Sequence, residues 1–228
     1  DQFGSDASAF FNLLSGYSDP PVWNKLVMAP LGLRQKLYEL IDNEITQVKK
    51  GHEGHIIAKM TSLIDKEITK KLYEASMGGV KIELIVRGIC CLKVGIPGVS
   101  ENISVRSIVG NFLEHSRIYY FHHNGDENLF LSSADMMTRN MIKRIEIEFP
   151  ILDKAIKKEI LSLMDVYLAD NTKARELHPD GTYRHVRNDR PAVDAQKYFM
   201  ELANKEKEIP ILAEKDSWFK KIQRRLKK

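Results

Sequence analysis

The hydrophobic positions of this chain follow two different periods, and the places where the period changes predict its secondary structure. Apolar residues recur at helical spacing over 33–48 and 153–168, which is typical of amphipathic helices with one buried face. Shorter apolar or alternating runs, bounded by Gly, Pro, Asn or Asp, predict strands. The predicted strands are 25–29, 55–60, 81–86, 104–108, 117–121, 128–131 and 144–149. Further helices are predicted within 1–18 and at 65–77, 136–143 and 194–207.

The order of these elements predicts an α/β fold. From 25 to 86 the chain reads strand, helix, strand, helix, strand, which implies a largely parallel sheet covered by helices. Asn124 and Gly125 lie between two strand-like runs and predict a hairpin turn. Asp153 is placed to cap the helix that follows it. The polar and irregular stretch 170–192 is expected to be loop.

Composition and charge limit the classes of protein to consider. The 228 residues, 43% of them hydrophobic, can bury a core of one or two domains. No window approaches the ~18 apolar residues of a membrane span, and the chain does not start with a secretion signal, so the expected location is cytoplasmic. Of the formal net charge of +4, residues 214–228 carry +5 and residues 1–213 carry −1. The body must therefore bind polyanions, if at all, through arginines clustered in space, whereas the basic tail is either solvated or a contact for nucleic acid or phospholipid.

Several common site types are not predicted. Cys90 and Cys91 are sequence neighbours, poorly placed to bridge each other, and we expect both to be small buried apolar residues. A zinc site would need more sulfur ligands, and the histidines show no metal-ligand spacing with carboxylates. The Walker-type Gly-Lys-Ser/Thr loop and the kinase Asp-Phe-Gly motif do not occur, which excludes the common ATP-site motifs.

The segment around His115 has the residue types of a phosphate site. The period of a strand places His115, Arg117 and Tyr119 on one face. A guanidinium group forms bidentate bonds to phosphate oxygens, and an imidazole exchanges a proton or attacks phosphorus near neutral pH. The alternative is a histidine that is simply hydrogen-bonded at a strand edge.

Ser132-Ser133-Ala134-Asp135 follows a predicted strand and precedes the helix-like 136–143. Hydroxyls and backbone N–H groups at a helix start would form an anion cradle. The alternative, an N-cap supplied by Ser133 or Asp135, fits the sequence equally well. With His-x-Arg before it, this segment is similar to the His-x-Lys and Gly-Ser-x-Asn elements of the phospholipase D superfamily, with Arg in place of Lys. Such sites use two histidine-bearing halves, so the single copy implies a missing half or a dimer.

Further basic residues lie at the ends of predicted elements. Arg87, Arg106, Arg139 and Arg144 each follow or end a strand or a helix, and each is equally compatible with an ordinary surface position. Lys59, within the strand 55–60, would add charge if its strand neighbours the site, but a surface position is the simpler interpretation.

These motifs together closely resemble one family, the bacterial polyphosphate kinases of the histidine-phosphorylating type. The resemblance runs from about Leu13 to about Arg187 and covers only the last phospholipase-D-like domain of that enzyme. It implies a mixed sheet flanked by helices. The motifs that carry it are Ile-Val-Arg-Gly-Ile-Cys-Cys-Leu, Val-Ser-Glu-Asn-Ile, Val-Arg-Ser-Ile-Val-Gly, Phe-Leu-Glu-His-Ser-Arg-Ile and Ser-Ser-Ala-Asp-Met-Met-Thr-Arg-Asn.

The resemblance implies reversible transfer of the terminal phosphate of ATP to inorganic polyphosphate, with Mg²⁺, through a phosphohistidine. In the family, residues matching Arg87 and His115 contact the nucleotide's phosphates, and the one matching Arg144 approaches the site. Other positions match the family pattern in a supporting role. They are Lys59, Arg106, Arg117, Ser133, Asp135 and Arg139. The phosphorylated histidine, the magnesium region and the tyrosine at the base all lie upstream in the family, so this chain is expected to carry half a site and to be inactive alone.

The resemblance and the abrupt start, without an initiator Met, predict a fragment of a longer enzyme. Residues 1–20 would be a remnant of the preceding domain or a linker, 21–207 the C-terminal phospholipase-D-like domain, and 208–228 a basic tail. The expected partners are ATP or ADP, polyphosphate and the upstream domains, in a homo-oligomer. No specific nucleic acid is expected, and membrane association is left open.

Two other functions remain to be weighed. One is a phospholipase-D-like phosphodiesterase in which a dimer brings two copies of His115 together. The other is a non-enzymatic polyanion-binding module that binds through the tail, 215–228; the phosphate-suited residues of the near-neutral body argue against it as the main role.

Overall fold

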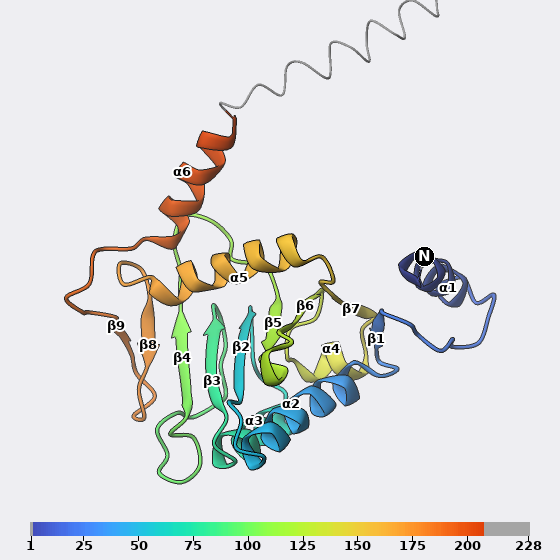
Figure 1. The fold of residues 1–228 in the computed structure, drawn as a ribbon, viewed down its shortest axis with the longest axis horizontal. Coiled ribbons are helices and arrows are strands. Elements are labelled where there is room, and N and C mark those ends of the chain that lie inside the picture. The colour runs from blue at the N-terminus through green and yellow to red at the C-terminus, as the bar shows by residue number, and fades with distance from the viewer. Residues whose placement is uncertain (1, 208–228) are drawn as a thin grey trace, which may run out of the picture.

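A computed structural model describes residues 2–207; Asp1 and the predicted basic tail, 208–228, lie outside the described residues. Within residues 2–207 the strands form one sheet in the order β1-β7-β6-β5-β2-β3-β4-β8-β9 (Figure 1). The strands are β1 (Val27–Ala29), β2 (His55–Met60), β3 (Lys81–Val86), β4 (Ile103–Ser107), β5 (Ile118–Phe121), β6 (Asn128–Ser132), β7 (Glu146–Pro150), β8 (Arg175–Leu177) and β9 (Tyr183–His185). The helices are α1 (Gln2–Leu14), α2 (Leu33–Lys49), α3 (Lys66–Met77), α4 (Thr138–Ile142), α5 (Lys154–Ala169) and α6 (Ala195–Lys207).

The sheet is mixed, as the predicted fold class requires. β2, β3 and β4 are parallel neighbours. The remaining pairs, β1 with β7, β7 with β6, β6 with β5, β5 with β2, β4 with β8 and β8 with β9, are antiparallel. The expectation of a largely parallel sheet, which came from the strand–helix order, is therefore wrong. β1 does not join β2 but pairs with β7 at the far edge, because a local pattern does not fix which neighbour a strand takes.

Helices cover both faces of this sheet. On one face α2 and α3 bury Leu37, Ile41 and Leu72 against the sheet. On the other face α5 buries Met164 against the neighbouring strands. Figure 1 shows α5 crossing the sheet near the ends of β2, β3 and β4, and α6 projecting beyond it. With helices on both faces, the central strands read as nearly continuous apolar runs.

Alternate side chains of β2 point to these two faces. Ile56, Ala58 and Met60 belong to the core under α2 and α3. Ile57 belongs to the core under α5, and the period of two puts Lys59 on that same side. The surface position expected for Lys59 is wrong, since only 2% of its side chain is exposed.

Local signals gave several element ends correctly. Asp153 caps α5 by accepting hydrogen bonds from the backbone N–H groups of Ala155 and Ile156 at 2.8 and 3.0 Å. The hairpin predicted at Asn124 and Gly125 joins β5 to β6. Both residues have positive φ (55° and 94°), a backbone conformation that asparagine and glycine adopt more readily than other residues.

The stretch 170–192, expected to be loop, contains the hairpin of β8 and β9. Each of these strands has three residues, Arg-Glu-Leu and Tyr-Arg-His, so neither carries an apolar run that periodicity could detect. The expectation for the cysteines is also half wrong: Cys90 is partly buried, but Cys91 is exposed, and both are free thiols.

α1 lies at the edge of the molecule beside β1 (Figure 1). Its buried Asp6 accepts hydrogen bonds from the backbone N–H groups of Asn24, Lys25 and Leu26 at 2.6–3.1 Å. This carboxylate links α1 to the segment that leads into β1. The division of the chain at residue 20 stays a prediction. Among residues 2–207, no helix combines the length and the hydrophobicity needed to cross a membrane.

Candidate functional site

Polar side chains gather at the edge of the sheet where β2 and β3 end. β6 runs in the same direction as β2, and β5 runs opposite, so the end of β6 and the start of β5 lie at that same edge. Short bridges connect Leu63, just after β2, to Cys90 and Met136. Four segments far apart in sequence therefore meet here, as expected for ligand sites of open α/β sheets.

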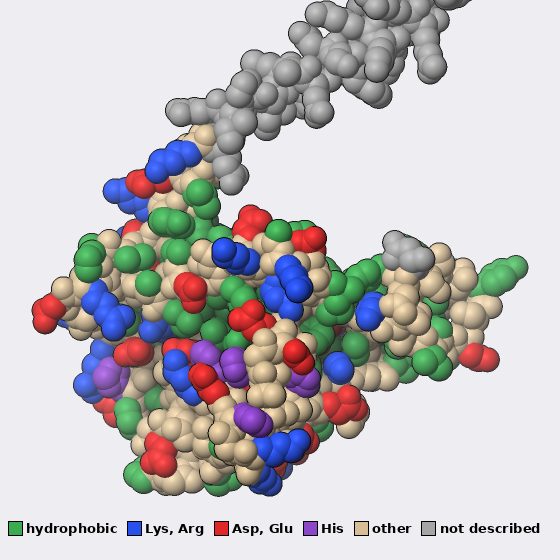
Figure 2. All heavy atoms as spheres, in the orientation of Figure 1, with side chains coloured by type: hydrophobic (Ala, Val, Ile, Leu, Met, Phe, Trp, Pro, Cys, Tyr) green, Lys and Arg blue, Asp and Glu red, His purple; other side chains and the backbone are tan. Residues whose placement is uncertain are grey.

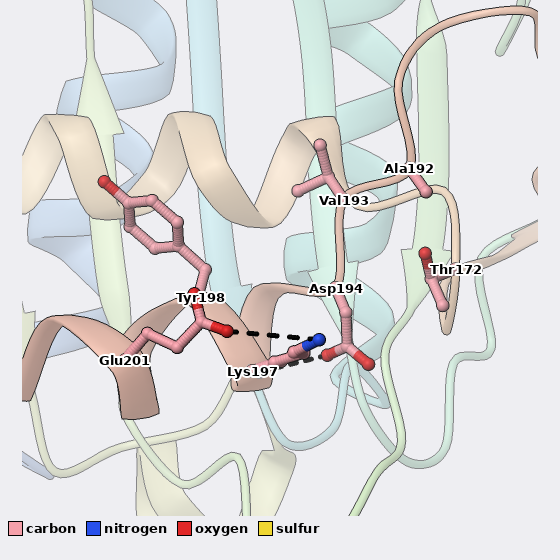
Figure 3. A pocket seen from close by; sticks show the side chains of 7 residues that line it. All are labelled: Thr172, Ala192, Val193, Asp194, Lys197, Tyr198 and Glu201. Atoms are coloured by element: carbon pink, nitrogen blue, oxygen red, sulfur yellow. Dashed lines mark hydrogen bonds and ion pairs between the residues drawn. The ribbon is translucent and has the colours of Figure 1, made fainter. Parts of the chain in front are cut away.

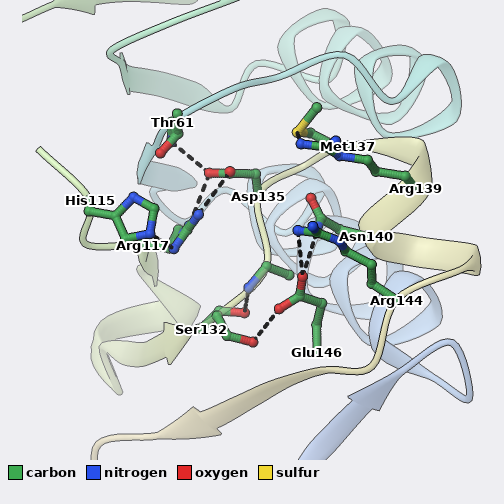
Figure 4. A network of polar contacts seen from close by, with 12 residues as sticks. Thr61, His115, Arg117, Ser132, Asp135, Met137, Arg139, Asn140, Arg144 and Glu146 are labelled. Atoms are coloured by element: carbon green, nitrogen blue, oxygen red, sulfur yellow. Dashed lines mark hydrogen bonds and ion pairs between the residues drawn. The ribbon is translucent and has the colours of Figure 1, made fainter.

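The centre of this edge is an ion pair between Arg117 and Asp135 (Figure 4). Arg117 Nε donates to Asp135 Oδ1 at 3.1 Å, and Nη2 donates to Oδ2 at 3.0 Å. Asp135 Oδ1 also accepts the backbone N–H of Thr61 at 2.7 Å, which ties it to the end of β2. The carboxylate of Asp135 raises the pKa of Arg117 above its already high value. The guanidinium is thus charged and fixed in orientation.

His115 contacts the outer edge of that guanidinium. Arg117 Nη1 lies 3.1 Å from His115 Nε2. Arginine has only donors, so Nε2 is the acceptor in this contact, which corresponds to the tautomer with the proton on Nδ1. His115 and Arg117 are in contact as predicted, but the strand period does not place them there, because β5 begins only at Ile118. Tyr119, expected on the same face, is buried beneath them and donates its hydroxyl to the carbonyl of Ala134 at 2.6 Å.

The Ser132–Asp135 segment takes neither of its predicted forms. α4 begins only at Thr138 with Met137 as its N-cap, so neither Ser133 nor Asp135 caps it. Ser132 donates to the carbonyl of Ile147 at 3.0 Å, and Ser133 contacts both the Glu146 carboxylate at 2.5 Å and the Ile147 N–H at 3.0 Å. The expectation of an anion-binding cradle at a helix start is wrong. The two serine hydroxyls instead connect the end of β6 to β7.

The four predicted arginines fall into two groups. Arg106 donates to the carbonyl of Leu168 and lies 3.7 Å from Glu176 Oε1, so it fastens β4 to α5 and β8. Arg87 directly follows β3, and its buried Nε has no hydrogen-bond partner among the described residues. Arg139 lies in α4 and Arg144 shortly after it, and both are exposed. Arg144 keeps one long contact, 3.9 Å to Glu146 Oε1 (Figure 4). Arg87, Arg139 and Arg144 therefore have donors left for a ligand.

Lys59 lies beneath the loop that carries His115. Its Nζ donates to Ser116 Oγ at 2.8 Å and lies 3.1 Å from Glu114 Oε2. It also lies 4.7 Å from the ring centre of Tyr167 on α5. Burial lowers the pKa of Lys59, and Glu114 opposes that change. The sequence analysis missed Glu114, although it is part of the Glu-His-Ser-Arg motif, and gave no signal for Tyr167.

The charged groups near the site do not form a metal centre. Within residues 2–207, no cluster of three or more His, Cys, Asp or Glu side chains could hold an ion. Asp135 is occupied by Arg117, and Glu114 is occupied by Lys59. Figure 2 shows basic, acidic and histidine side chains interspersed over the face in view, in keeping with the near-neutral body.

Several hollows border α6, and two of them are relevant to the site. One, of about 480 Å³, borders the His115 loop and is largely apolar, with Phe112, Tyr167, Phe199 and Met200 in its wall. The other lies at the start of α6 and contains Asp194, Lys197 and Glu201 (Figure 3). The second has mixed charge and none of the predicted site residues.

The sequence can now be compared with known proteins. The family model for "Polyphosphate kinase C-terminal domain 2" matches residues 26–196. The chain belongs to this family. A polyphosphate kinase of Staphylococcus haemolyticus is 50% identical over 240 residues, covering 100% of this chain, and one of Bacillus cereus is 58% identical over 82% of it.

A solved structure agrees with this family. The polyphosphate kinase of Porphyromonas gingivalis has a TM-score of 0.85 and 39% identity, covering 89% of this chain and 31% of its own. A phospholipase D family member of Salmonella typhimurium has a TM-score of 0.49 and 14% identity, too low for an argument. The chain spans 33% of the Staphylococcus haemolyticus relative and 26% of the Bacillus cereus relative. The chain therefore spans about a third or less of the length of these relatives.

Proposed function

We propose that this chain is the C-terminal part of a polyphosphate kinase. The terminal phosphoryl group of ATP would pass to a histidine nitrogen in an upstream domain, releasing ADP, and then to a terminal oxygen of polyphosphate. Each step breaks one bond to phosphorus and forms another, and the sequence of steps is reversible. This chain would contribute groups that bind and neutralise the phosphates, because phosphoryl transfer depends mainly on positioning and charge stabilisation.

One observation carries this proposal beyond family membership. His115 Nε2 faces Arg117, whose guanidinium is fixed by Asp135, at the edge where Arg87 Nε has no hydrogen-bond partner within residues 2–207. An imidazole beside fixed and free guanidinium groups is suited to a phosphate chain.

We assign phosphate binding to Arg87, His115 and Arg144, which have atoms left for a ligand. Arg139 is exposed on the same side and would support them. Other residues would hold the site's shape, because their polar groups already have protein partners. These are Lys59, Arg106, Arg117, Ser133 and Asp135.

Magnesium would be held elsewhere. The carboxylates beside the site are taken by Arg117 and Lys59, so the described residues do not fit a Mg²⁺ centre, and no step is assigned to the ion here. The proposed partners are ATP or ADP, polyphosphate and the upstream domains, in a cytoplasmic homo-oligomer.

The test is a chimera in which this chain replaces the matching segment of the Staphylococcus haemolyticus relative. It is incubated with Mg²⁺ and ATP labelled on the terminal phosphate, and acid-labile phosphoprotein and polymer are measured. We expect label and polymer from the chimera and neither from this chain alone. Arg87→Ala and His115→Ala should each lower polymer formation roughly 100-fold. Arg184→Ala, at an exposed arginine on β9, is the control and should leave the rate unchanged.

Two results would contradict the proposal. Labelling of this chain alone, abolished by His115→Ala, would make His115 the nucleophile. Hydrolysis of a phosphodiester by this chain without ATP, abolished by the same substitution, would favour the phospholipase-D-like alternative.

A further inference from the structure

The loop between β4 and β5 carries His115 but has little support of its own. Among the described residues, 109–116 make no backbone–backbone hydrogen bond outside regular structure, and the segment contains no helix or strand. His115 and its neighbour Ser116 are exposed, whereas Glu114 is 8% exposed. The geometry of His115 must therefore be imposed by side chains that reach this loop from other elements.

Gln196, at the start of α6, makes three such contacts. Its Nε2 donates to the carbonyl of Phe112 at 2.9 Å and to Glu114 Oε1 at 2.7 Å. Its Oε1 accepts the N–H of Phe112 at 3.1 Å. The amide thus pairs with the loop backbone as a neighbouring strand would, and Gln196 is 7% exposed.

The loop is shaped to admit this side chain. A Cβ atom on Gly110 would lie 2.3 Å from Gln196 Oε1, which is far inside contact distance. Any residue larger than glycine at 110 would therefore displace the amide or the loop.

Glu114 connects Gln196 to a second residue, Lys59 on β2. While Oε1 accepts from Gln196, Oε2 lies 3.1 Å from Lys59 Nζ, which also donates to Ser116. Glu114 and Ser116 flank His115 in sequence. The loop is consequently held on both sides of His115, by α6 on one side and by the central strand β2 on the other.

The start of α6 is itself fixed. Asp170, fully buried after α5, accepts the N–H of Ala195 at 2.8 Å with one oxygen and those of Lys173 and Ala174 with the other. Asp194 accepts the N–H of Lys197 at 3.1 Å (Figure 3). The backbone that carries Gln196 is therefore held in place on both sides, as a positioning role requires.

We propose that Gln196 is a positioning residue for His115, acting through Glu114 and Lys59 to keep His115 Nε2 against Arg117. Gln196 reaches no reacting atom, and its effect on phosphoryl transfer rests on the function proposed above. α6 thereby becomes part of the phosphate site although it follows β5 by more than seventy residues.

The first test needs no activity. Nitrogen-resolved NMR of this chain with isotope-labelled histidine reports which ring nitrogen of His115 carries the proton. We expect the Nδ1–H form in the unsubstituted chain and a shift toward the Nε2–H form, favoured by free histidine, in Gln196→Met. This substitution keeps the size of the side chain and removes its hydrogen bonds. Lys197→Ala, at the exposed next position, is the control and should leave the tautomer unchanged.

Gly110→Ala provides a second route to the same loss, since it pushes the amide away without altering α6. It keeps the inference testable if Gln196→Met fails to fold, which thermal unfolding of each variant would reveal. An Nδ1–H tautomer retained in both folded variants would overturn the inference.

The second test measures kinetics in the chimera described above. Gln196→Met should lower kcat by roughly 100-fold, as expected for a small displacement of a group at the reacting centre, with little change in KM for ATP. An unchanged kcat would overturn the inference. An unsubstituted chimera without kinase activity would instead contradict the proposed function, and the NMR experiment would still decide the role of Gln196.

Discussion

Two neighbouring regions of the site use their charged residues in opposite ways. At the start of β5, Arg117 and Asp135 are 14% and 8% exposed and make two hydrogen bonds to each other. In the segment through α4 and β7, Arg144 is 58% exposed with one contact at 3.9 Å. Farther along β7, Glu148 is fully buried and neither of its oxygens has a partner among the described residues.

The difference separates structural charge from charge available to a ligand. The guanidinium of Arg117 is used to fix the end of β6 and to orient His115, so it has little left to offer a phosphate. Arg144 contributes little to the fold and keeps its donors free. Both residues are arginines at strand ends, so residue type and position in the sequence did not distinguish them.

The largest loss of stability is expected from breaking the paired region. Asp135→Ala would leave Arg117 nearly buried without its counterion and would also remove the acceptor of the Thr61 N–H. The free energy of unfolding should fall by about 3 kcal/mol, as for other buried pairs that lose one partner. Denaturant unfolding of this chain measures it. The control is Glu67→Ala, which removes a carboxylate 3.0 Å from the exposed Lys70 and should change stability little.

A change of the opposite sign, a gain of stability that depends on pH, is expected at Glu148. Burial raises its pKa from the ordinary 4.5 to about 8, with Lys36 as an opposing charge. Between these two pH values the folded protein holds a proton on Glu148 that the unfolded chain has released, so this group costs stability progressively as the pH rises. Glu148→Gln should remove that loss and stabilise the protein above pH 8 by on the order of 4 kcal/mol, with little difference below pH 4.5.

Unfolding curves of the unsubstituted chain and Glu148→Gln over this pH range provide the measurement. Glu146→Gln is a useful comparison, because Glu146 is 9% exposed but accepts hydrogen bonds from Ser133 and Asn140. If the free energy of unfolding depended on pH equally in the unsubstituted chain and in Glu148→Gln, the Glu148 carboxyl would not be the cause of that dependence.

The smallest effect on stability, and a clear one on binding, is expected at Arg144. Arg144→Ala should change the free energy of unfolding by less than about 0.5 kcal/mol, since the residue is exposed and its ion pair is long. Its affinity for polyphosphate should fall about tenfold through loss of charge-assisted bonds. Titration of the chimera with polyphosphate at low and high salt measures this effect. If Arg184→Ala weakened binding equally, a general charge effect would be the explanation.

The sequence by itself determined the features that depend on near neighbours. Helical periodicity located α2 and α5, Asp153 marked the start of α5, and Asn124 with Gly125 marked the β5–β6 turn. These features rest on backbone geometry and on interactions within a few positions, so a local pattern is enough to reveal them.

Only the tertiary structure decided which distant groups meet. It paired β1 with β7, buried Lys59 under α5, fastened Arg106 to Leu168, and brought Gln196 to Glu114 across 82 positions of sequence. It also found strands β8 and β9, which are too short to show a period. The physical reason is that partners of a buried polar group are chosen by the packing of whole elements, and neither period nor composition records that choice.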